Sequence, residues 1–115
     1  MKHIETYEKF NLDELNFKKY LVYKSENDVA VHAYVMEVVK FRPRYSKIHK
    51  ENILWVMIKS CFLDGVLFLD PEKFQDIYHI NISDDWLSHI IYQTDDFNSA
   101  IELLESISNV EKYNL

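Results

Sequence analysis

The sequence predicts an α+β fold in which an antiparallel β-meander of about five strands carries a C-terminal α-helix packed on one face. Three observations support this fold class. Apolar residues alternate with period two in several segments, one Asp-Gly pair separates two apolar runs, and apolar residues recur at helical spacing near the C-terminus. A small curled barrel closed by the helix is the alternative. With 115 residues, 48% of them hydrophobic, the chain 1–115 has the size of one domain.

The first three strands are predicted from runs of apolar and aromatic residues. Residues 17–24 form a compact run of this kind, and residues 29–39 alternate with period two. Both faces of the 29–39 segment are largely apolar, as in a central strand that is covered on both sides. Pro43 interrupts this segment because proline cannot donate to a ladder. Residues 52–62 predict the next strand.

A tight hairpin is predicted at Asp64-Gly65, which lies between two apolar runs. A type I′ turn requires positive φ at both central residues, and Asp-Gly is among the pairs that tolerate it best. The protein contains only this glycine, so we interpret it as turn chemistry and not as part of a functional loop. Residues 66–69 should return as a short strand antiparallel to the previous one.

The following segments are more varied. Asp70 is a suitable helix cap and Pro71 suits the first helical position, so one helical turn is expected through Gln75. Residues 76–82 are predicted as strand or loop, and residues 86–93 as a strand.

The C-terminal helix is predicted from a cap and an apolar stripe. Thr94 or Asp96 can accept hydrogen bonds from the first free N–H groups, and acidic residues near this end complement the helix dipole. The residues that share the apolar face are Phe97, Ala100, Ile101, Leu104 and Ile107.

Charge is segregated along the chain. Residues 40–50 carry five of the 13 Lys and Arg residues and no carboxylate, although the formal net charge of the protein is −6. Residues 64–115 hold 2 basic and 11 acidic residues. Such a surface repels phosphates and can attract basic proteins or occupy a groove that binds nucleic acid. The alternative is that these carboxylates only keep the domain soluble.

The basic segment 40–50 is the strongest candidate for a binding site in the sequence. Cations bind phosphate, and an interleaved aromatic ring can stack on a base. The segment is therefore predicted to bind a partner or phosphate, either in nucleic acid or a nucleotide or on an acidic protein surface. A solvated connection between strands is the structural alternative. The residues of this candidate site are Lys40, Arg42, Arg44, Tyr45, Lys47 and Lys50.

Several enzyme classes are excluded by missing motifs. One glycine is too few for a P-loop or a dinucleotide fingerprint, and the sequence has no nucleophile elbow, no HExxH motif and no zinc-ligand spacing. We therefore expect no catalytic residues, no metal and no cofactor. The single cysteine, Cys61, excludes an intramolecular disulfide and is expected to be a buried thiol.

Two histidines support a hydrolase as a third hypothesis. If the segments around His79 and His89 pair across a turn, both rings could approach Asp84 or Asp85 and form a metal or acid-base site. Partly exposed strand histidines without function are the alternative that we favour.

Together these features predict a small acidic, non-enzymatic protein that binds another macromolecule in the cytoplasm, with no membrane segment. Eight tyrosines are expected to contribute an aromatic surface on the sheet face that the helix leaves uncovered. A composition rich in Ile, Asn, Lys, Tyr and Phe favours a phage or mobile-element origin, and hence an inhibitor of a host nuclease or defence complex. A nucleic-acid or nucleotide-binding module is the alternative. An exposed edge strand is also compatible with a homodimer.

Overall fold

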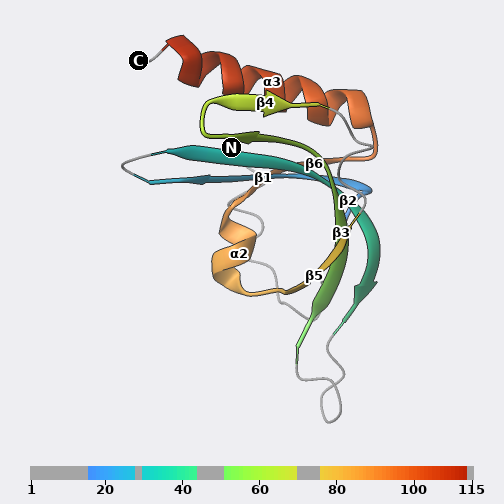
Figure 1. Cartoon of the computed structure of the whole chain (residues 1–115). Helices are drawn as coiled ribbons and strands as arrows, with labels where there is room; N and C mark the ends of the chain where they lie inside the picture. Colours follow the sequence, from blue (N-terminus) through green and yellow to red (C-terminus); the bar gives the residue numbers. More distant parts are fainter. Residues whose placement is uncertain (1–15, 28–29, 44–50, 70–75, 114–115) are drawn as a thin grey trace.

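The computed structural model describes residues 16–27, 30–43, 51–69 and 76–113, and shows an antiparallel sheet of six strands with two helices in this part of the chain (Figure 1). The predicted α+β class, with a C-terminal helix packed against the sheet, is confirmed. The strands are β1 (Tyr20–Glu26), β2 (Val31–Arg42), β3 (Ile53–Leu63), β4 (Val66–Phe68), β5 (Ile77–Asn81) and β6 (Ile90–Thr94), and the helices are α2 (Asp84–Ser88) and α3 (Phe97–Tyr113).

The first four strands follow the predicted meander, and the last two depart from it. The strand order is β4-β3-β2-β1-β6, and β5 pairs with β3 beside this path. On its side away from β2, β3 pairs with β4 along 61–63 and with β5 along 53–57. After β5 the chain crosses to the other side of the sheet, where β6 pairs with β1. Strands β5 and β6, which follow each other in the sequence, therefore lie at opposite edges of the sheet.

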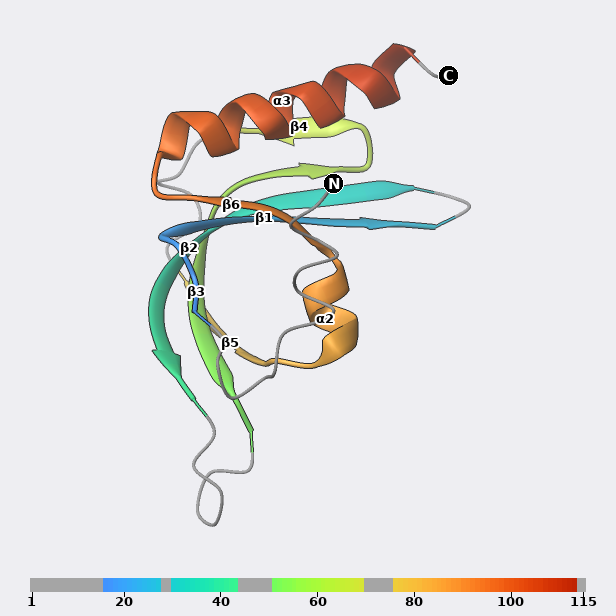
Figure 2. The same ribbon diagram turned by 180° about the vertical axis from the view of Figure 1, so that it is seen from behind.

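The sheet is strongly curved. Register shifts occur in β2 between Val35 and Met36 and between Val38 and Lys40, and bulges of this kind bend a strand and increase its twist. Figures 1 and 2 show α2 inside the curve and α3 on the other side of the sheet. The sheet does not close into a barrel within the described residues, because β5 pairs only with β3 and β6 only with β1.

Helix α3 covers one side of the sheet with the predicted apolar face. Its Ala100 and Leu104 side chains have no exposed surface, and Ile107 is also buried. The helix begins as expected at Asp96, whose carboxylate accepts hydrogen bonds from the backbone N–H (3.2 Å) and hydroxyl (2.6 Å) of Ser99. These hydrogen bonds hold the pKa of the Asp96 carboxyl below its usual value. The buried residues of this cluster are Val22, Ala33, Val35, Phe62, Ala100, Leu104 and Ile107.

A second cluster fills the concave side of the sheet. In β2, Ala33 and Val35 face α3, whereas Met36 belongs to the concave cluster and Tyr34 packs against it. Strand β2 is therefore apolar on both faces because each face packs against one of the two clusters, as the sequence predicted for a central strand. The buried residues of the concave cluster are Leu21, Met36, Leu54, Val56, Ile82, Leu87 and Ile90.

The turn between β3 and β4 has the predicted chemistry. Asp64 has φ 52° and Gly65 has φ 79°, so both central residues adopt the left-handed conformation that a type I′ hairpin requires. A Cβ atom at Gly65 would meet no heavy atom within 4 Å. Glycine is therefore favoured here by its backbone freedom and not by lack of space.

The segment 86–93, predicted as a strand, is only partly extended. Its first residues belong to helix α2, and only β6 is a strand. The helix forms because the Ser83 hydroxyl accepts a hydrogen bond from the backbone N–H of Trp86 at 3.1 Å, and because Asp84 and Asp85 occupy the first turn. The segment 76–82, predicted as strand or loop, contains strand β5.

Other predictions have mixed outcomes. The turn expected over 70–75 lies outside the described residues.

Cys61 is buried as predicted, and burial raises the pKa of its thiol. Among the described residues, neither helix combines the length and the apolar run that crossing a membrane would require.

Candidate functional site

Of the predicted basic site, the structure describes Lys40 and Arg42, which lie at the end of β2. The other four members, Arg44, Tyr45, Lys47 and Lys50, lie outside the described residues. Lys40 is paired with Trp55 of β3, and Trp55 is paired with His79 of β5 on its other side. The Lys40 Nζ atom is 5.2 Å from the Trp55 ring centroid, and the centroids of Trp55 and His79 are 6.3 Å apart. We call Lys40, Trp55 and His79 the outer row.

The outer row combines a cation with two flat rings. Lys40 is exposed, and the nearby Arg42 keeps a buried Nε atom that has no hydrogen-bond partner among the described residues. By contrast, Lys59 of the same sheet is paired with Glu37 at 3.5 Å. An exposed cation beside an aromatic ring can contact a phosphate while the ring stacks on a planar group.

The outer row is also remote from helix α3, which carries exposed acidic residues. Figures 1 and 2 place the far ends of β2 and β3 at the opposite end of the molecule from α3. The exposed residues of α3 include Glu102 and Glu105. Their carboxylates therefore lie far from Lys40 and Arg42, and their repulsion of an anion bound there is weakened by distance and by salt.

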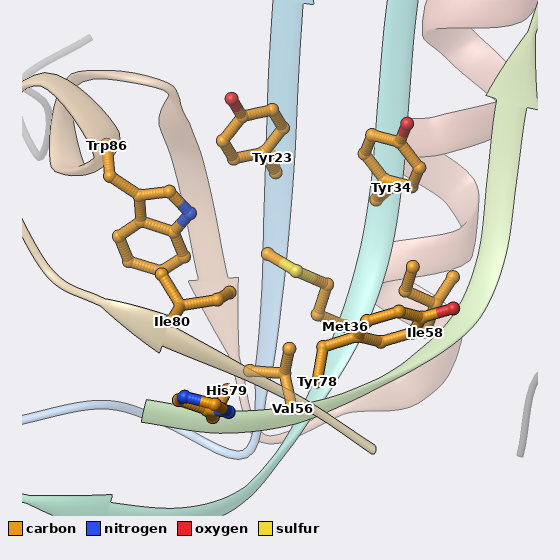
Figure 3. Close-up of a pocket in the computed structure, with 9 residues that line it drawn as sticks. All are labelled: Tyr23, Tyr34, Met36, Val56, Ile58, Tyr78, His79, Ile80 and Trp86. Atoms are coloured by element: carbon orange, nitrogen blue, oxygen red, sulfur yellow. The ribbon is translucent and has the colours of Figure 1, made fainter. Parts of the chain in front are cut away.

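A pocket of about 330 Å³ lies on the concave side of the sheet (Figure 3). It is built from β1, β2, β3, β5 and α2, so its lining residues come from segments spread over positions 23 to 86 of the sequence. The residues that line the pocket are Tyr23, Tyr34, Met36, Val56, Ile58, Tyr78, His79, Ile80 and Trp86.

Aromatic rings form much of the pocket wall. The ring centroids of Tyr23 and Tyr34 are 5.9 Å apart, and those of Tyr23 and Trp86 are 6.3 Å apart. In Figure 3 the ring nitrogen of Trp86 points into the space between these side chains. No lining residue is Lys, Arg, Asp or Glu. The pocket therefore suits an uncharged group more than an ion, because no opposite charge compensates desolvation.

The hydroxyls of Tyr23 and Tyr34 stay protonated at neutral pH. Burial raises the pKa of Tyr23, and the negative charge of Asp85 raises it further. Burial also raises the pKa of Tyr34, with smaller contributions from Cys61 and Tyr23. Both hydroxyls can therefore donate a hydrogen bond as well as accept one.

A third surface is an exposed apolar edge of the sheet. Strands β4 and β5 pair with β3 on one side, and on the other side neither has a partner strand within the described residues. Their large apolar side chains are unusually exposed. We call the following residues the apolar edge: Val66 (50% exposed), Phe68 (37%), Leu69 (44%), Ile77 (53%) and Tyr78 (49%).

The histidines proposed for a hydrolase site contact different aromatic rings. His79 lies against Trp55, whereas His89 lies against Tyr23 with a centroid distance of 5.2 Å. The Nδ1 atom of His89 is 3.1 Å from the backbone oxygen of Lys24. In the described part of the chain, no group of three or more His, Cys, Asp or Glu side chains is placed to hold a metal ion. The hydrolase hypothesis gains no geometric support.

Sequence reasoning predicted an aromatic face but not the pocket or its residues. Tyr23, Tyr34 and Tyr78 do gather on the sheet face that α3 leaves uncovered. The abundance of tyrosine was the available signal. Their convergence with Trp86 depends on α2, which was not predicted, and on the curvature of the sheet, which was considered only in the barrel alternative. Comparison of the chain with protein-family models, with curated proteins and with solved structures finds no match.

Proposed function

We propose that this chain is a non-enzymatic binding domain that recognises another protein along its apolar edge. The observation that supports this proposal is the coincidence of exposed apolar side chains with edge strands whose outer backbone groups have no partner strand among the described residues. An added strand satisfies such N–H and C=O groups, and it covers the apolar side chains at the same time.

A polypeptide fits this edge better than a nucleic acid does. Strand addition requires alternating backbone donors and acceptors, which an extended peptide supplies and a phosphate backbone does not. The exposed carboxylates of Asp64 and Asp76 flank β4 and β5, so a partner strand with basic flanking residues would be favoured over an acidic one.

Within this proposal, an inhibitor is the specific form that size, charge segregation and composition favour. Such a protein would be encoded by a phage or mobile element and would occlude a site on a host nuclease or defence complex. Its acidic half would favour the basic surfaces with which nucleases bind nucleic acid. If this form is correct, adding the purified protein lowers the activity of the captured complex; unchanged activity at saturation would contradict it.

The test is a capture experiment with two matched variants. Ile77→Lys places a charge on the apolar edge, and Val110→Lys places the same charge on α3, where the parent residue is equally exposed at 53%. Tagged proteins are incubated with nuclease-treated lysate of the producing cell or its host. We expect a protein that is captured by the wild type and by Val110→Lys, and lost with Ile77→Lys. Equal capture by all three forms, or no capture, would refute the edge proposal.

The outer row favours nucleic-acid binding as a second candidate function. Lys40 and Trp55 provide a cation and a ring on one exposed sheet surface, and the acidic helix α3 lies at the other end of the molecule. Proteins that bind single strands without sequence preference use this combination of stacking and positive charge.

This candidate is tested by the anisotropy of labelled single-stranded RNA and DNA at several salt concentrations. Lys40→Ala should weaken binding. It should also reduce the slope of the logarithm of the binding constant against the logarithm of the salt concentration by about 0.7, the value for one lost phosphate contact. Trp55→Ala should weaken binding about tenfold with little change in slope. Lys24→Ala is the control for a cation outside the outer row, since Lys24 lies on β1 opposite Ala33, far along the ladder from Lys40, and pairs with Glu26 at 3.4 Å. Equal effects of Lys40→Ala and Lys24→Ala would exclude the outer row as the site.

A further inference from the structure

The concave pocket borders β5, whose outer edge has no partner strand among the described residues. Three consecutive residues of this strand, Tyr78, His79 and Ile80, line it. Consecutive strand residues point to opposite faces; accordingly Tyr78 is paired with Val56 on the concave side and His79 with Trp55 in the outer row. A cavity that touches all three lies against the backbone of β5. Tyr78, which lines the cavity, is 49% exposed, so the cavity borders solvent beside this edge strand.

From this continuity we propose that the pocket receives one uncharged aromatic side chain of a partner strand that pairs with β5. The inference rests on the proposed protein-binding function and names the chemistry of the contact. A strand added to β5 extends the sheet, so every second side chain points to the concave side, next to Tyr78 or Ile80. A long side chain at that position enters the pocket while its backbone completes the edge.

The dimensions of the pocket match one ring. A volume of about 330 Å³ is at the lower end for small-molecule sites, and it accepts a single large side chain. Aromatic pairs prefer centroid separations of roughly 4.5 to 7 Å, and the existing neighbours are 5.9 Å and 6.3 Å apart around Tyr23. Met36 lies near Tyr23 and Trp86 in Figure 3, and its sulfur can make a favourable contact with the edge of an incoming ring.

The polarity of the pocket selects against charged side chains. Its walls contain no ionised Asp, Glu, Lys or Arg, so a buried charge would find no compensating partner. The polar side-chain atoms of the lining residues are the tyrosine hydroxyls, the Trp86 indole N–H and the ring nitrogens of His79, which can bond to a neutral hydroxyl or contact a ring face. Phe, Tyr or Trp therefore fits, whereas Lys, Arg, Asp or Glu does not.

The inference is tested by NMR on the full chain with N-acetyl-phenylalaninamide, an uncharged mimic of one residue with an aromatic side chain. The protein has two tryptophans, so its indole N–H signals report on the two faces separately. We expect a saturable shift of the Trp86 indole signal and none for Trp55, which lies in the outer row. N-acetyl-alaninamide, which lacks the ring, should shift neither signal.

Two aromatic residues of the apolar edge provide a matched pair of variants. Tyr78 lines the pocket and is 49% exposed, whereas Phe68 is 37% exposed and does not line it. Because both side chains are partly exposed, their removal should leave the protein folded. Tyr78→Ala should weaken probe binding about fivefold, the value of one lost aromatic contact, and Phe68→Ala should leave it unchanged. Filling the pocket with Ile58→Phe should abolish the Trp86 shift.

Three outcomes would overturn the inference: no shift at the solubility limit of the probe, a shift of Trp55 in place of Trp86, or equal weakening by Tyr78→Ala and Phe68→Ala. The capture experiment with Ile77→Lys is measured independently. Suppose that the probe causes no Trp86 shift but Ile77→Lys still loses the captured protein. The pocket would then be excluded as the site of an aromatic side chain, and the apolar edge would remain the proposed protein-binding surface.

Discussion

The two sides of the sheet are covered in different ways. On one side, the 17-residue helix α3 packs aliphatic side chains onto β1 and β2, and Ala100 and Leu104 are completely buried. On the concave side, the five-residue helix α2 covers less of the sheet, and an aromatic pocket of about 330 Å³ remains. Close packing accounts for stability, whereas a cavity that is lined by rings loses contacts unless something fills it. The helix side is therefore the more completely covered one, and the proposed anchor pocket lies on the side where packing is incomplete.

The strongest test of this division is the truncation of Leu104 on the helix side. Leu104→Ala removes a side chain with no exposed surface, so we expect the free energy of unfolding to fall by about 3 kcal/mol. Val110→Ala is the control because Val110 is 53% exposed on the same helix, and it should change stability by less than about 0.5 kcal/mol. Urea denaturation measures both. Similar losses would mean that α3 does not pack through its predicted face.

The concave side should respond less to the same kind of truncation where it borders the pocket. Ile58→Ala enlarges a space that already exists, so we expect a loss of about 1.5 kcal/mol in the free energy of unfolding. Ile90→Ala provides the comparison within this cluster, because Ile90 is fully buried and should cost about 3 kcal/mol. Equal losses would show that the pocket wall is packed as tightly as the buried part of the concave cluster.

The cap of α2 connects stability with the pocket, because this short helix carries Trp86. Ser83→Ala removes the acceptor for the Trp86 N–H and should lower the free energy of unfolding by about 1 kcal/mol. Ser83→Asp keeps an acceptor oxygen and should retain most of that stability. Thermal unfolding compares the variants, and the Trp86 indole signal reports the position of the ring. An unchanged melting temperature in Ser83→Ala would show that the cap is dispensable.

Tyr34→Phe is expected to have the smallest effect on the free energy of unfolding at neutral pH. The difference from the wild type should become measurable only at alkaline pH. Burial raises the pKa of Tyr34 above its usual value of 10.0. The folded state therefore holds this proton more tightly than the unfolded state, and the resulting stability is present below pH 10 and lost as pH rises through the folded pKa. We expect the wild type to lose more stability than Tyr34→Phe above pH 10. Parallel pH profiles would contradict the burial of this hydroxyl.

The elements that were predicted correctly are encoded by local patterns. The apolar spacing of α3, the alternation in β2 and the Asp64-Gly65 turn each depend on neighbouring residues, and each is found in the structure. Helix α2 was missed because the apolar run at 86–93 outweighed the cap at Ser83. The recognisable signal was Ser followed by two acidic residues.

The candidate surfaces were less predictable because they depend on long-range pairing. The basic segment and its members Lys40 and Arg42 were apparent from charge alone, whereas the contact of Lys40 with Trp55 requires the register of β2 and β3. The pocket requires β5 to return to β3 and α2 to lie within the curve. Nothing local in the sequence specifies those distant pairings.

The placement of β6 beside β1 has a consequence for the order of folding. Tyr20 pairs with Thr94, so the first described strand is completed on its second edge by one of the last. A growing chain can form the β1 to β4 meander from contacts between neighbouring strands, which are quick to close. The two apolar faces of that meander remain uncovered until α2, β6 and α3 have been synthesised. Cooperative folding should therefore begin only after the final third of the chain has emerged, and a product truncated before α2 would expose both apolar faces.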